Sequence, residues 1–424
     1  MLTHVLHAHF PLIFESPGFR WLWLANLVSK LGDWLGFIAL NLYVFDLTGS
    51  ATALAGLLAV ESIPALLIGP VAGVIIDRFS RRKVMILANL GAALTFALLP
   101  LASALWQIYV LALLSRVAFS FFDPAERSLV PDLVGKEKVL TANSALSVVN
   151  HLTLIVGPAI AGFLVAASSA AVAFWADAAS FVVAVLLISR IGGELPRTRS
   201  EGEVRPGWFD DLKFGLGYAF GSRALRVLLV TTFVAAFAGA ALITIEVVYV
   251  KDVLDGGDIG YGLLYSIAGF GAILGSTNAT RLSQRFTVPG LYVATVLLTG
   301  LMFFPYANVQ ILWFVIIVAG LHTIPWVLGY ILVDTMLQQW VADEVRGRIF
   351  GLIHTQRSAG QVLVAGMLAP LVDWWGPVTV LNLSGIIYTL VGLYAISRLG
   401  VLRQEEARWR SGDDSLPLSS EGAL

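Results

Sequence analysis

The stretch "GVIIDRFSRRKVMI", residues 73–86, places a dense group of charges between two long apolar runs. A membrane helix needs roughly 20 predominantly apolar residues, and each flanking run is about that long. Basic residues concentrate in the cytoplasmic loops of membrane proteins, so a short basic segment between two such runs indicates a cytoplasmic turn. The charged residues of this turn are Asp77, Arg78, Arg81, Arg82 and Lys83.

The composition of the whole chain agrees with a membrane protein. Of its 424 residues, 58% are hydrophobic and 13% are charged, and the mean hydropathy is +0.82. Soluble domains carry about 25% charged residues. The chain has no cysteine, which excludes disulfides, thiolate zinc sites and cysteine nucleophiles.

The sequence contains no motif for nucleotide or peptide-bond hydrolysis. Neither a GxxxxGK[ST] loop nor an HExxH helix occurs. We therefore expect a protein that is not an enzyme, has no metal or cofactor, does not bind nucleic acid and uses an ion gradient as its energy source. One elementary charge moving through 100 mV supplies about 2.3 kcal/mol.

Apolar runs predict an all-α membrane protein with twelve transmembrane helices in two pseudo-symmetric six-helix bundles. The polar segment between the two sets of six is the longest loop of the chain. The predicted spans are 19–46, 52–76, 82–102, 104–122, 142–166, 171–190, 224–250, 259–280, 289–306, 309–336, 349–371 and 375–398.

The domain organisation follows from these spans. We expect an N-terminal bundle at 1–190, a cytoplasmic linker with a surface helix at 191–223, and a C-terminal bundle at 224–400. The polar tail, 401–424, is expected to be disordered. With both termini cytoplasmic, Lys251 is the sole basic residue in an outer loop, which places the protein in the plasma (inner) membrane as a multi-pass chain.

Short internal matches indicate that the halves are related. "VPDLVGK" at 130–136 precedes the fifth predicted span, and "VADEVRG" at 341–347 precedes the eleventh. Duplicated six-helix halves are the plan of transporters that bind their substrate between two bundles. The sequence does not indicate an oligomer, and a monomer would suffice.

Several motifs resemble the major facilitator superfamily over roughly residues 18–400. "GVIIDRFSRR" is similar to its loop motif after the second span, and Arg116 resembles an arginine of its fourth span. Gly157, Pro158 and Gly162 resemble a fifth-span motif of proton-driven exporters. "FFDPAERSLVPDLVGKEKVLTANSAL", "FWADAASF" and "RGRIFGL" look like the drug/proton antiporter branch that holds macrolide and siderophore exporters.

The resemblance implies a gating role for the hairpin, carried by Gly73, Asp77, Arg78, Arg81 and Arg82. A carboxylate near a helix N-terminus gains about 0.3–1 kcal/mol, enough to bias two states and weak enough to release. The alternative interpretation is that the hairpin only anchors the topology.

Three ionisable residues fall at similar depth in the first half. At 1.5 Å per residue, Asp33, Glu61 and Arg116 lie roughly 20, 14 and 18 Å from the outer surface. Such residues cost about 2.5–3.5 kcal/mol each at a helix centre unless they pair or face a cavity. We interpret the two carboxylates as candidate proton carriers and Arg116 as the cation that tunes them. A fixed buried ion pair is the alternative.

Three further residues complete the candidate site for proton coupling and substrate. Asp177 lies roughly 10 Å from the outside, and helix packing explains it as well as transport. His322 is either a coupling residue or a hydrogen-bonded structural histidine. Arg357 is a candidate partner for substrate or for Asp334.

These observations predict a secondary active transporter that exports hydrophobic small molecules in exchange for protons. A lipid or lysolipid flippase, or a siderophore exporter of the same fold, is the first alternative. A non-transporting receptor or scaffold is the second, although a scaffold has no reason to carry ionisable groups at midplane depth. Membrane-depth charges of both signs leave the substrate's charge open.

Overall fold

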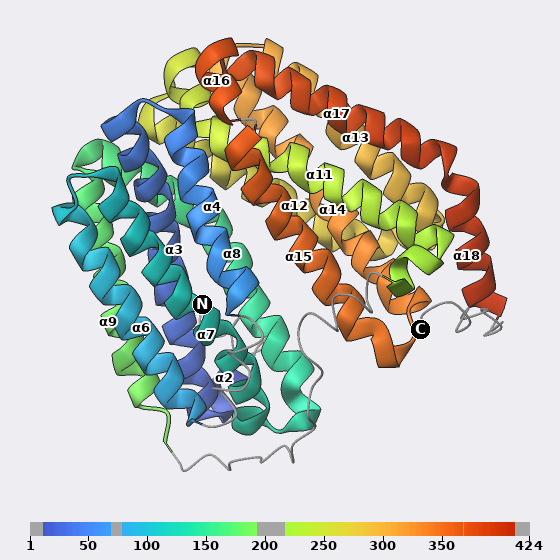
Figure 1. Cartoon of the computed structure of the whole chain (residues 1–424). Helices are drawn as coiled ribbons and strands as arrows, with labels where there is room; N and C mark the ends of the chain where they lie inside the picture. Colours follow the sequence, from blue (N-terminus) through green and yellow to red (C-terminus); the bar gives the residue numbers. More distant parts are fainter. Residues whose placement is uncertain (1–11, 69–78, 193–216, 368, 412–424) are drawn as a thin grey trace. The chain divides into compact units, whose positions relative to one another are not determined.

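The computed structural model describes residues 12–68, 79–192, 217–367 and 369–411. Within those ranges the chain is helical and contains no strand, which confirms the all-α fold class (Figure 1). The helices of the first half are α2 (Leu12–Glu15), α3 (Pro17–Thr48), α4 (Ala51–Leu67), α6 (Arg81–Leu98), α7 (Leu105–Val134), α8 (Val139–Ala167) and α9 (Ala170–Ser189).

The second half continues the same pattern. Its helices are α11 (Arg223–Val248), α12 (Gly257–Arg285), α13 (Val288–Asn308), α14 (Leu312–Trp340), α15 (Asp343–Met367), α16 (Ala369–Trp375), α17 (Pro377–Ser397) and α18 (Leu399–Ser411). The described part also contains a short helical segment at 217–221, 3-10 turns at Leu99–Leu101 and Lys136–Lys138, and a π-helical turn at Tyr249–Val253.

Helices occupy all twelve predicted places. Among the described residues, ten helices are long and apolar enough to cross a membrane. The other two places are held by α4, whose described part ends at Leu67, and by α15, which is more polar than the rest. The predicted eleventh span, 349–371, is divided in the structure between α15 and α16.

Local sequence sets the boundaries of the first helices. Ser16 caps α3 by accepting a hydrogen bond from the backbone N–H of Phe19 at 3.3 Å. At the other end, Gly49 adopts φ of 59°, a left-handed conformation that glycine reaches without strain, and its N–H bonds to Phe45 O. Ser50 then caps α4, so two long helices are joined by a two-residue turn.

Residues group into two compact units. The first comprises residues 1–203 and 250–266, and the second comprises 204–249 and 267–424. The first ten residues of α12, 257–266, therefore belong to the first unit, and the rest of that helix to the second.

The same helix pairs pack inside each half. In the first, α3 contacts α8 and α9, and α6 contacts α7 and α9. In the second, α11 contacts α15 and α17, and α13 contacts α14 and α17. Numbered by span, these are the same four pairs, so the two halves share one packing plan, as expected for duplicated halves.

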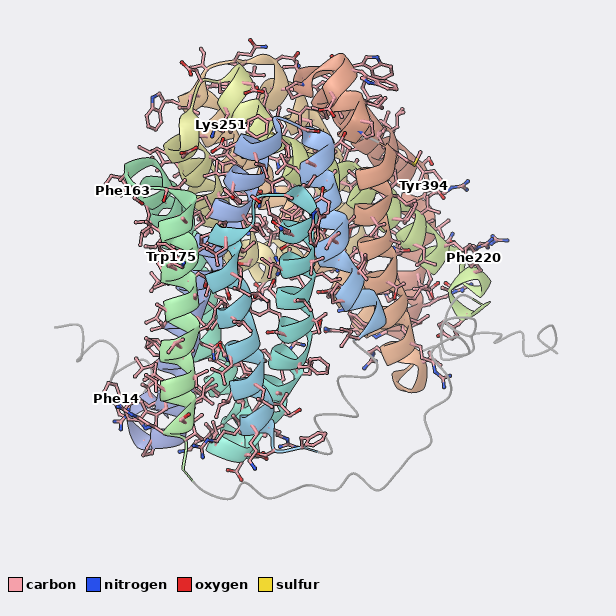
Figure 2. The ribbon with its side chains drawn as sticks, turned by 60° about the vertical axis from the view of Figure 1, so that its left-hand side comes forward. Phe14, Phe163, Trp175, Phe220, Lys251 and Tyr394 are labelled. Carbon is pink, nitrogen blue, oxygen red and sulfur yellow. The ribbon has the colours of Figure 1, made fainter. Side chains whose placement is uncertain are left out.

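Large apolar side chains cover the outer faces of the helices. Phe163 on α8 and Trp175 on α9, both labelled in Figure 2, remain 64% and 54% exposed. Soluble monomers rarely carry continuous apolar surface of this kind, whereas a lipid bilayer covers it.

The structure of the C-terminal tail differs from the prediction. Disorder was expected from residue 401, but α18 continues the helix to Ser411. Leu402 is fully buried, and Glu406 is buried with an ion pair to Arg410 at 2.8 Å. The segment therefore has a packed face, directed at α13, α11 and α14, that its high charge content conceals. Residues 412–424 and most of the predicted linker helix lie outside the described residues.

Candidate functional site

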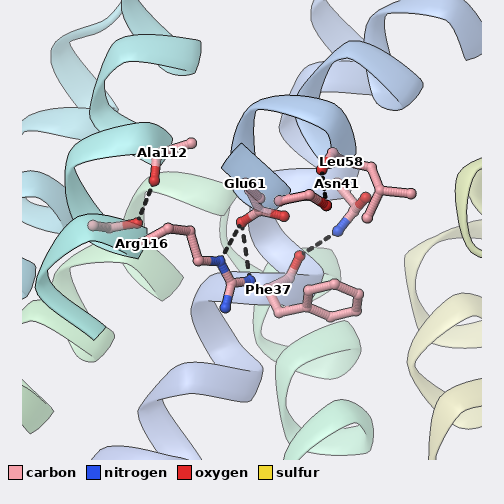
Figure 3. A network of polar contacts seen from close by, with 8 residues as sticks. Phe37, Asn41, Leu58, Glu61, Ala112 and Arg116 are labelled. Atoms are coloured by element: carbon pink, nitrogen blue, oxygen red, sulfur yellow. Dashed lines mark hydrogen bonds and ion pairs between the residues drawn. The ribbon is translucent and has the colours of Figure 1, made fainter. Parts of the chain in front are cut away.

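The main polar contact of the first unit joins α4 and α7. Nε and Nη2 of Arg116 each lie 3.0 Å from the same carboxylate oxygen, Oε1 of Glu61 (Figure 3). The guanidinium also lies over the ring of Phe119 at 5.8 Å. The structure therefore brings together two of the three residues that the sequence placed at one depth.

A second contact fixes the same helix pair. The hydroxyl of Tyr109 on α7 donates to Ala53 O on α4 at 2.7 Å. Glu61 is eight residues after Ala53, and Arg116 is seven residues after Tyr109. These separations correspond to about 12 and 10 Å along the two helices. The two contacts therefore join α4 and α7 at points about two helical turns apart.

Asp33 stands apart from this pair. Its Oδ1 is buried and, within the described part of the chain, has no hydrogen-bond partner. The charged groups that act on it electrostatically are Lys30, Arg116 and Asp123, yet no ion pair within 4.0 Å joins Asp33 to any described residue. The guanidinium of Arg116 is already engaged by Glu61, so Asp33 keeps a carboxylate with no direct cation partner.

Asp177 on α9 is completely buried against α3. Its Oδ1 accepts a hydrogen bond from Ser180 Oγ at 3.2 Å, and its Oδ2 has no partner among the described residues. A Cβ added at Gly32 would lie 2.5 Å from Oδ1, and one added at Gly36 would collide with Oδ2. The carboxylate thus occupies a notch that these two glycines leave on α3.

This notch places a second acid near Asp33. Among the charged groups around Asp177, Asp33 has the largest electrostatic effect. Sequence reasoning assigned Asp177 to packing or to transport, and the geometry agrees with both. The Gly32-xxx-Gly36 spacing is a signal that the sequence analysis missed, because small residues four apart let another helix or its side chains approach closely.

The fifth-span motif acts through close approach of helices. A Cβ at Gly157 would lie 2.6 Å from Cβ of Trp34 on α3. One at Gly162 would lie 2.6 Å from the carbonyl oxygen of Asp258, at the start of α12 in the same unit. Pro158 lies inside α8 beside this contact, and its carbonyl oxygen faces Gly262.

Two residues of the hairpin motif are described, and both tie the start of α6 to neighbouring helices. Arg81 donates to Ser128 O at 2.7 Å and forms an ion pair with Asp132, both near the end of α7. Arg82 donates to Ser189 O at the end of α9. Gly73, Asp77 and Arg78 lie outside the described residues, so their gating role stays a prediction.

In the second unit, His322 sits in an aromatic environment on α14. Its ring packs edge-on against Phe303 at 5.0 Å and lies 6.4 Å from that of Tyr306. Nε2 is buried and finds no hydrogen-bond partner in the described ranges. His322 is therefore not brought together with another titratable candidate of that unit.

Arg357 on α15 borders a cavity of the second unit. The space is about 360 Å³ including its open side. Its walls carry threonines and several aromatic residues, including Tyr292, Trp326, Tyr330 and Tyr388.

A family model described as "Transmembrane secretion effector" matches residues 10–413. The uncharacterised MFS-type transporter YfiS of Bacillus subtilis is 26% identical over 397 residues, covering 91% of this chain and 94% of its own. The enterobactin exporter EntS of Salmonella typhi is 26% identical over 403 residues, covering 93% and 95%.

Solved structures show the same fold. A mutant of the nucleoside transporter NupG superposes with a TM-score of 0.77 at 11% identity, covering 90% of this chain and 99% of its own. A bacterial homologue of the iron transporter ferroportin gives 0.70 at 15% identity, with coverage of 90% and 99%. Because the family match spans nearly the whole sequence and the helices repeat as two packed sets of six, this chain belongs to the transmembrane secretion effector family and is a transporter of the major facilitator superfamily.

Proposed function

We propose that this transporter exports small molecules in exchange for protons and that Asp33 carries the proton. The observation behind the proposal is the buried Oδ1 of Asp33, which lacks a partner among the described residues. An ionised carboxylate in a nonpolar setting is costly unless a cation or hydrogen bonds offset it, and protonation removes that cost. Asp33 is therefore suited to change its charge when the site opens to a different side.

Glu61 and Arg116 have a different role in this proposal. Their pair is held by two nitrogen donors on one oxygen, which gives a charge-assisted contact of defined geometry. Arg116 also acts electrostatically on Asp33. A fixed Glu61–Arg116 pair thus provides a constant field, while Asp33 gains and loses its proton.

In this proposal Asp177 supports Asp33 and is not itself the proton carrier. Asp33 and Asp177 interact electrostatically within the first unit. Two interacting acids are less costly to bury when they hold one proton between them. Each acid has one oxygen without a partner in the described part, but Asp177 is completely buried and held by Ser180, whereas Asp33 is only partly buried and is the more accessible of the two. The exchangeable proton is accordingly assigned to Asp33.

The membrane setting completes the proposal. The basic residues between the predicted spans favour cytoplasmic termini and insertion in the plasma membrane. Export then follows from a proton gradient that is acidic outside, because the return of protons drives the change of state.

Inside-out vesicles provide the test. Vesicles from cells that express the chain are given an acidic lumen, which corresponds to the cell exterior. They are offered erythromycin, ethidium, enterobactin and lysophosphatidylcholine separately. We expect uptake of at least one compound when the lumen is acidified, and loss of that uptake when nigericin collapses the pH gradient. Uptake that is equal with and without the gradient would rule out proton coupling.

Siderophore export is a second candidate for the substrate. The observation in its favour is the 26% identity to enterobactin exporters along 93% of this chain. In the vesicle experiment, gradient-driven uptake of enterobactin alone would favour it. Movement of lysophosphatidylcholine without any gradient would instead favour the flippase alternative.

A further inference from the structure

The cavity of the second unit is lined by a cationic side chain, Arg357, with two donor atoms that no described residue uses. Nε and Nη2 of Arg357 are buried, and no described residue accepts a hydrogen bond from either atom. A guanidinium within a membrane segment is costly without a partner. Two vacant donors of one buried cation therefore require explanation.

These two donors form one edge of the guanidinium group. An arginine edge binds the two oxygens of a carboxylate or similar anion side by side, which gives both strength and direction. In the first unit Arg116 directs the same two atoms, Nε and Nη2, at a carboxylate, where both meet one oxygen of Glu61. In Arg357 the equivalent edge has no acceptor among the described residues.

Asp334 does not fill this role. Its Oδ1 lies 3.7 Å from Nη2 of Arg357, beyond hydrogen-bond reach, and its side chain is 43% exposed. The carboxylate balances part of the charge but leaves both donors open.

Several polar groups of the cavity walls already have partners within the protein. Thr295 and Thr299 donate to carbonyl oxygens of their own helix at 2.7 and 2.8 Å. The hydroxyl of Tyr292 shares a hydrogen bond of 2.6 Å with Thr231. Among the residues that line the cavity, Arg357 supplies the cationic donors, and its Nε and Nη2 remain for a ligand.

Aromatic rings surround the guanidinium. The ring of Tyr330 lies 4.4 Å from the guanidinium carbon, and Trp326 packs edge-on against Tyr330 at 5.1 Å. Tyr292 and Tyr388 line the same space. Such walls accept a flat apolar ring by stacking or edge contacts.

We infer that this cavity binds organic anions that carry an aromatic ring, with the anionic group on the Nε/Nη2 edge of Arg357 and the ring among Trp326, Tyr330 and Tyr388. The inference rests on the proposed export function, since it names the class of molecule exported. It assigns a preferred charge to the substrate, which the mixture of charges in the sequence left open.

The test measures binding to the full-length protein in lipid nanodiscs, without any gradient. The probes are naphthalene-1-sulfonate, which stays anionic, and the uncharged naphthalene-1-sulfonamide, which has the same ring. Equilibrium dialysis of the radiolabelled probes, corrected with empty nanodiscs, gives both affinities. We expect about tenfold or tighter binding of the sulfonate, in line with charge-assisted hydrogen bonds.

Variants assign this preference to the proposed edge. Arg357→Gln should abolish the preference and leave sulfonamide binding unchanged, whereas Arg357→Lys should keep part of it. Asp334→Asn should strengthen sulfonate binding, because it removes the competing anion. Arg281→Gln is the matched control, since Arg281 is an exposed arginine on α12 outside the cavity, and it should change neither affinity.

Several results would overturn the inference. These are equal affinity of the unmodified protein for both probes, no measurable binding of either, or a sulfonate preference that survives in Arg357→Gln. Should Arg357→Gln fail to fold, weaker sulfonate binding in Asp334→Asn would contradict the inference equally well.

A lipid headgroup offers the same anionic chemistry, so lysophosphatidylglycerol is added as a competitor. We expect it to displace the sulfonate poorly; displacement at lower concentration than unlabelled sulfonate would overturn the aromatic class. Because binding is measured here without a gradient, an absence of binding would contradict this inference without bearing on proton coupling. Conversely, a failure of gradient-driven uptake leaves the binding site intact.

Discussion

At the scale of single residues, Arg116 and Arg357 show how one side chain serves two purposes. Both present Nε and Nη2 toward the interior of their unit. In Arg116 this edge binds the carboxylate of Glu61, so the ion pair has a structural and electrostatic role within the protein. Arg357 has no such acceptor among the described residues, so its edge is available to a ligand.

Replacement of Arg116 by alanine should destabilise the protein and abolish transport. The substitution leaves Glu61 buried without its cation. Breaking a fully buried ion pair in this way costs about 3–5 kcal/mol of stability. We expect about 2–3 kcal/mol here, because Arg116 is partly exposed to solvent. The thermal unfolding midpoint in detergent measures the loss. The double variant Glu61→Gln/Arg116→Gln removes both charges and should be more stable than Arg116→Ala. Equal stability of the two variants would contradict a structural role for the pair.

The sequence predicts a common depth for Asp33, Glu61 and Arg116, which stays a prediction, but it does not predict the direction of their side chains. Counting 1.5 Å per residue placed Asp33, Glu61 and Arg116 in one layer. Each residue also rotates the side chain by about 100°, and span boundaries carry errors of several residues, so the count could not decide which carboxylate Arg116 meets. The sequence also could not show that Nε and Nη2 of Arg357 lack an acceptor, because this depends on the distance between Arg357 and Asp334.

At the scale of helices, hydrophobic runs predicted most elements and failed where a helix is amphipathic. The predicted fourth span ended at residue 122, but α7 continues to Val134. Phe122, Ala125 and Leu129 are buried in one core cluster with residues of α3 and α6, while charged residues lie between them in the sequence. Such spacing is a helical face rather than an apolar run, which also explains α18.

The contact between α3 and α9 depends on glycine. A Cβ at Gly36 would lie 2.5 Å from Cε1 of Phe96 and would also meet the carboxylate of Asp177. Gly36→Ala should therefore cost about 1–3 kcal/mol through overpacking. Gly91→Ala is the matched control, because its Cβ would make an ordinary contact of 3.6 Å with Ala118. If thermal unfolding finds Gly36→Ala as stable as Gly91→Ala, the notch is not required for packing.

At the scale of the whole molecule, the two halves repeat the same helix pairs, as the short matches "VPDLVGK" and "VADEVRG" predicted. The two halves of this chain are therefore more alike in helix packing than in sequence. The halves differ in their polar groups: the first contains acids beside α3, and the second contains an arginine in an aromatic cavity. This division suits a transporter in which one half carries the proton and the other contacts the substrate.

Topology is testable without a substrate. Green fluorescent protein fused after residue 205 or residue 420 should fluoresce, because both positions are expected in the cytoplasm. Alkaline phosphatase fused after residue 169, between α8 and α9, should be active because that turn is expected outside. Phosphatase activity from a fusion at 205 or 420 would reverse the proposed orientation and, with it, the direction of export.

The most direct test of the account compares the unmodified protein with Asp33→Asn in proteoliposomes, using the compound identified in the vesicle screen. Two modes are measured: transport driven by an imposed pH gradient, and exchange of labelled for unlabelled compound without a gradient. The amide keeps the shape of the side chain but cannot carry the proton. We expect Asp33→Asn to retain exchange and to lose the response to the gradient. Gradient-driven transport equal to that of the unmodified protein would contradict Asp33 as the proton carrier.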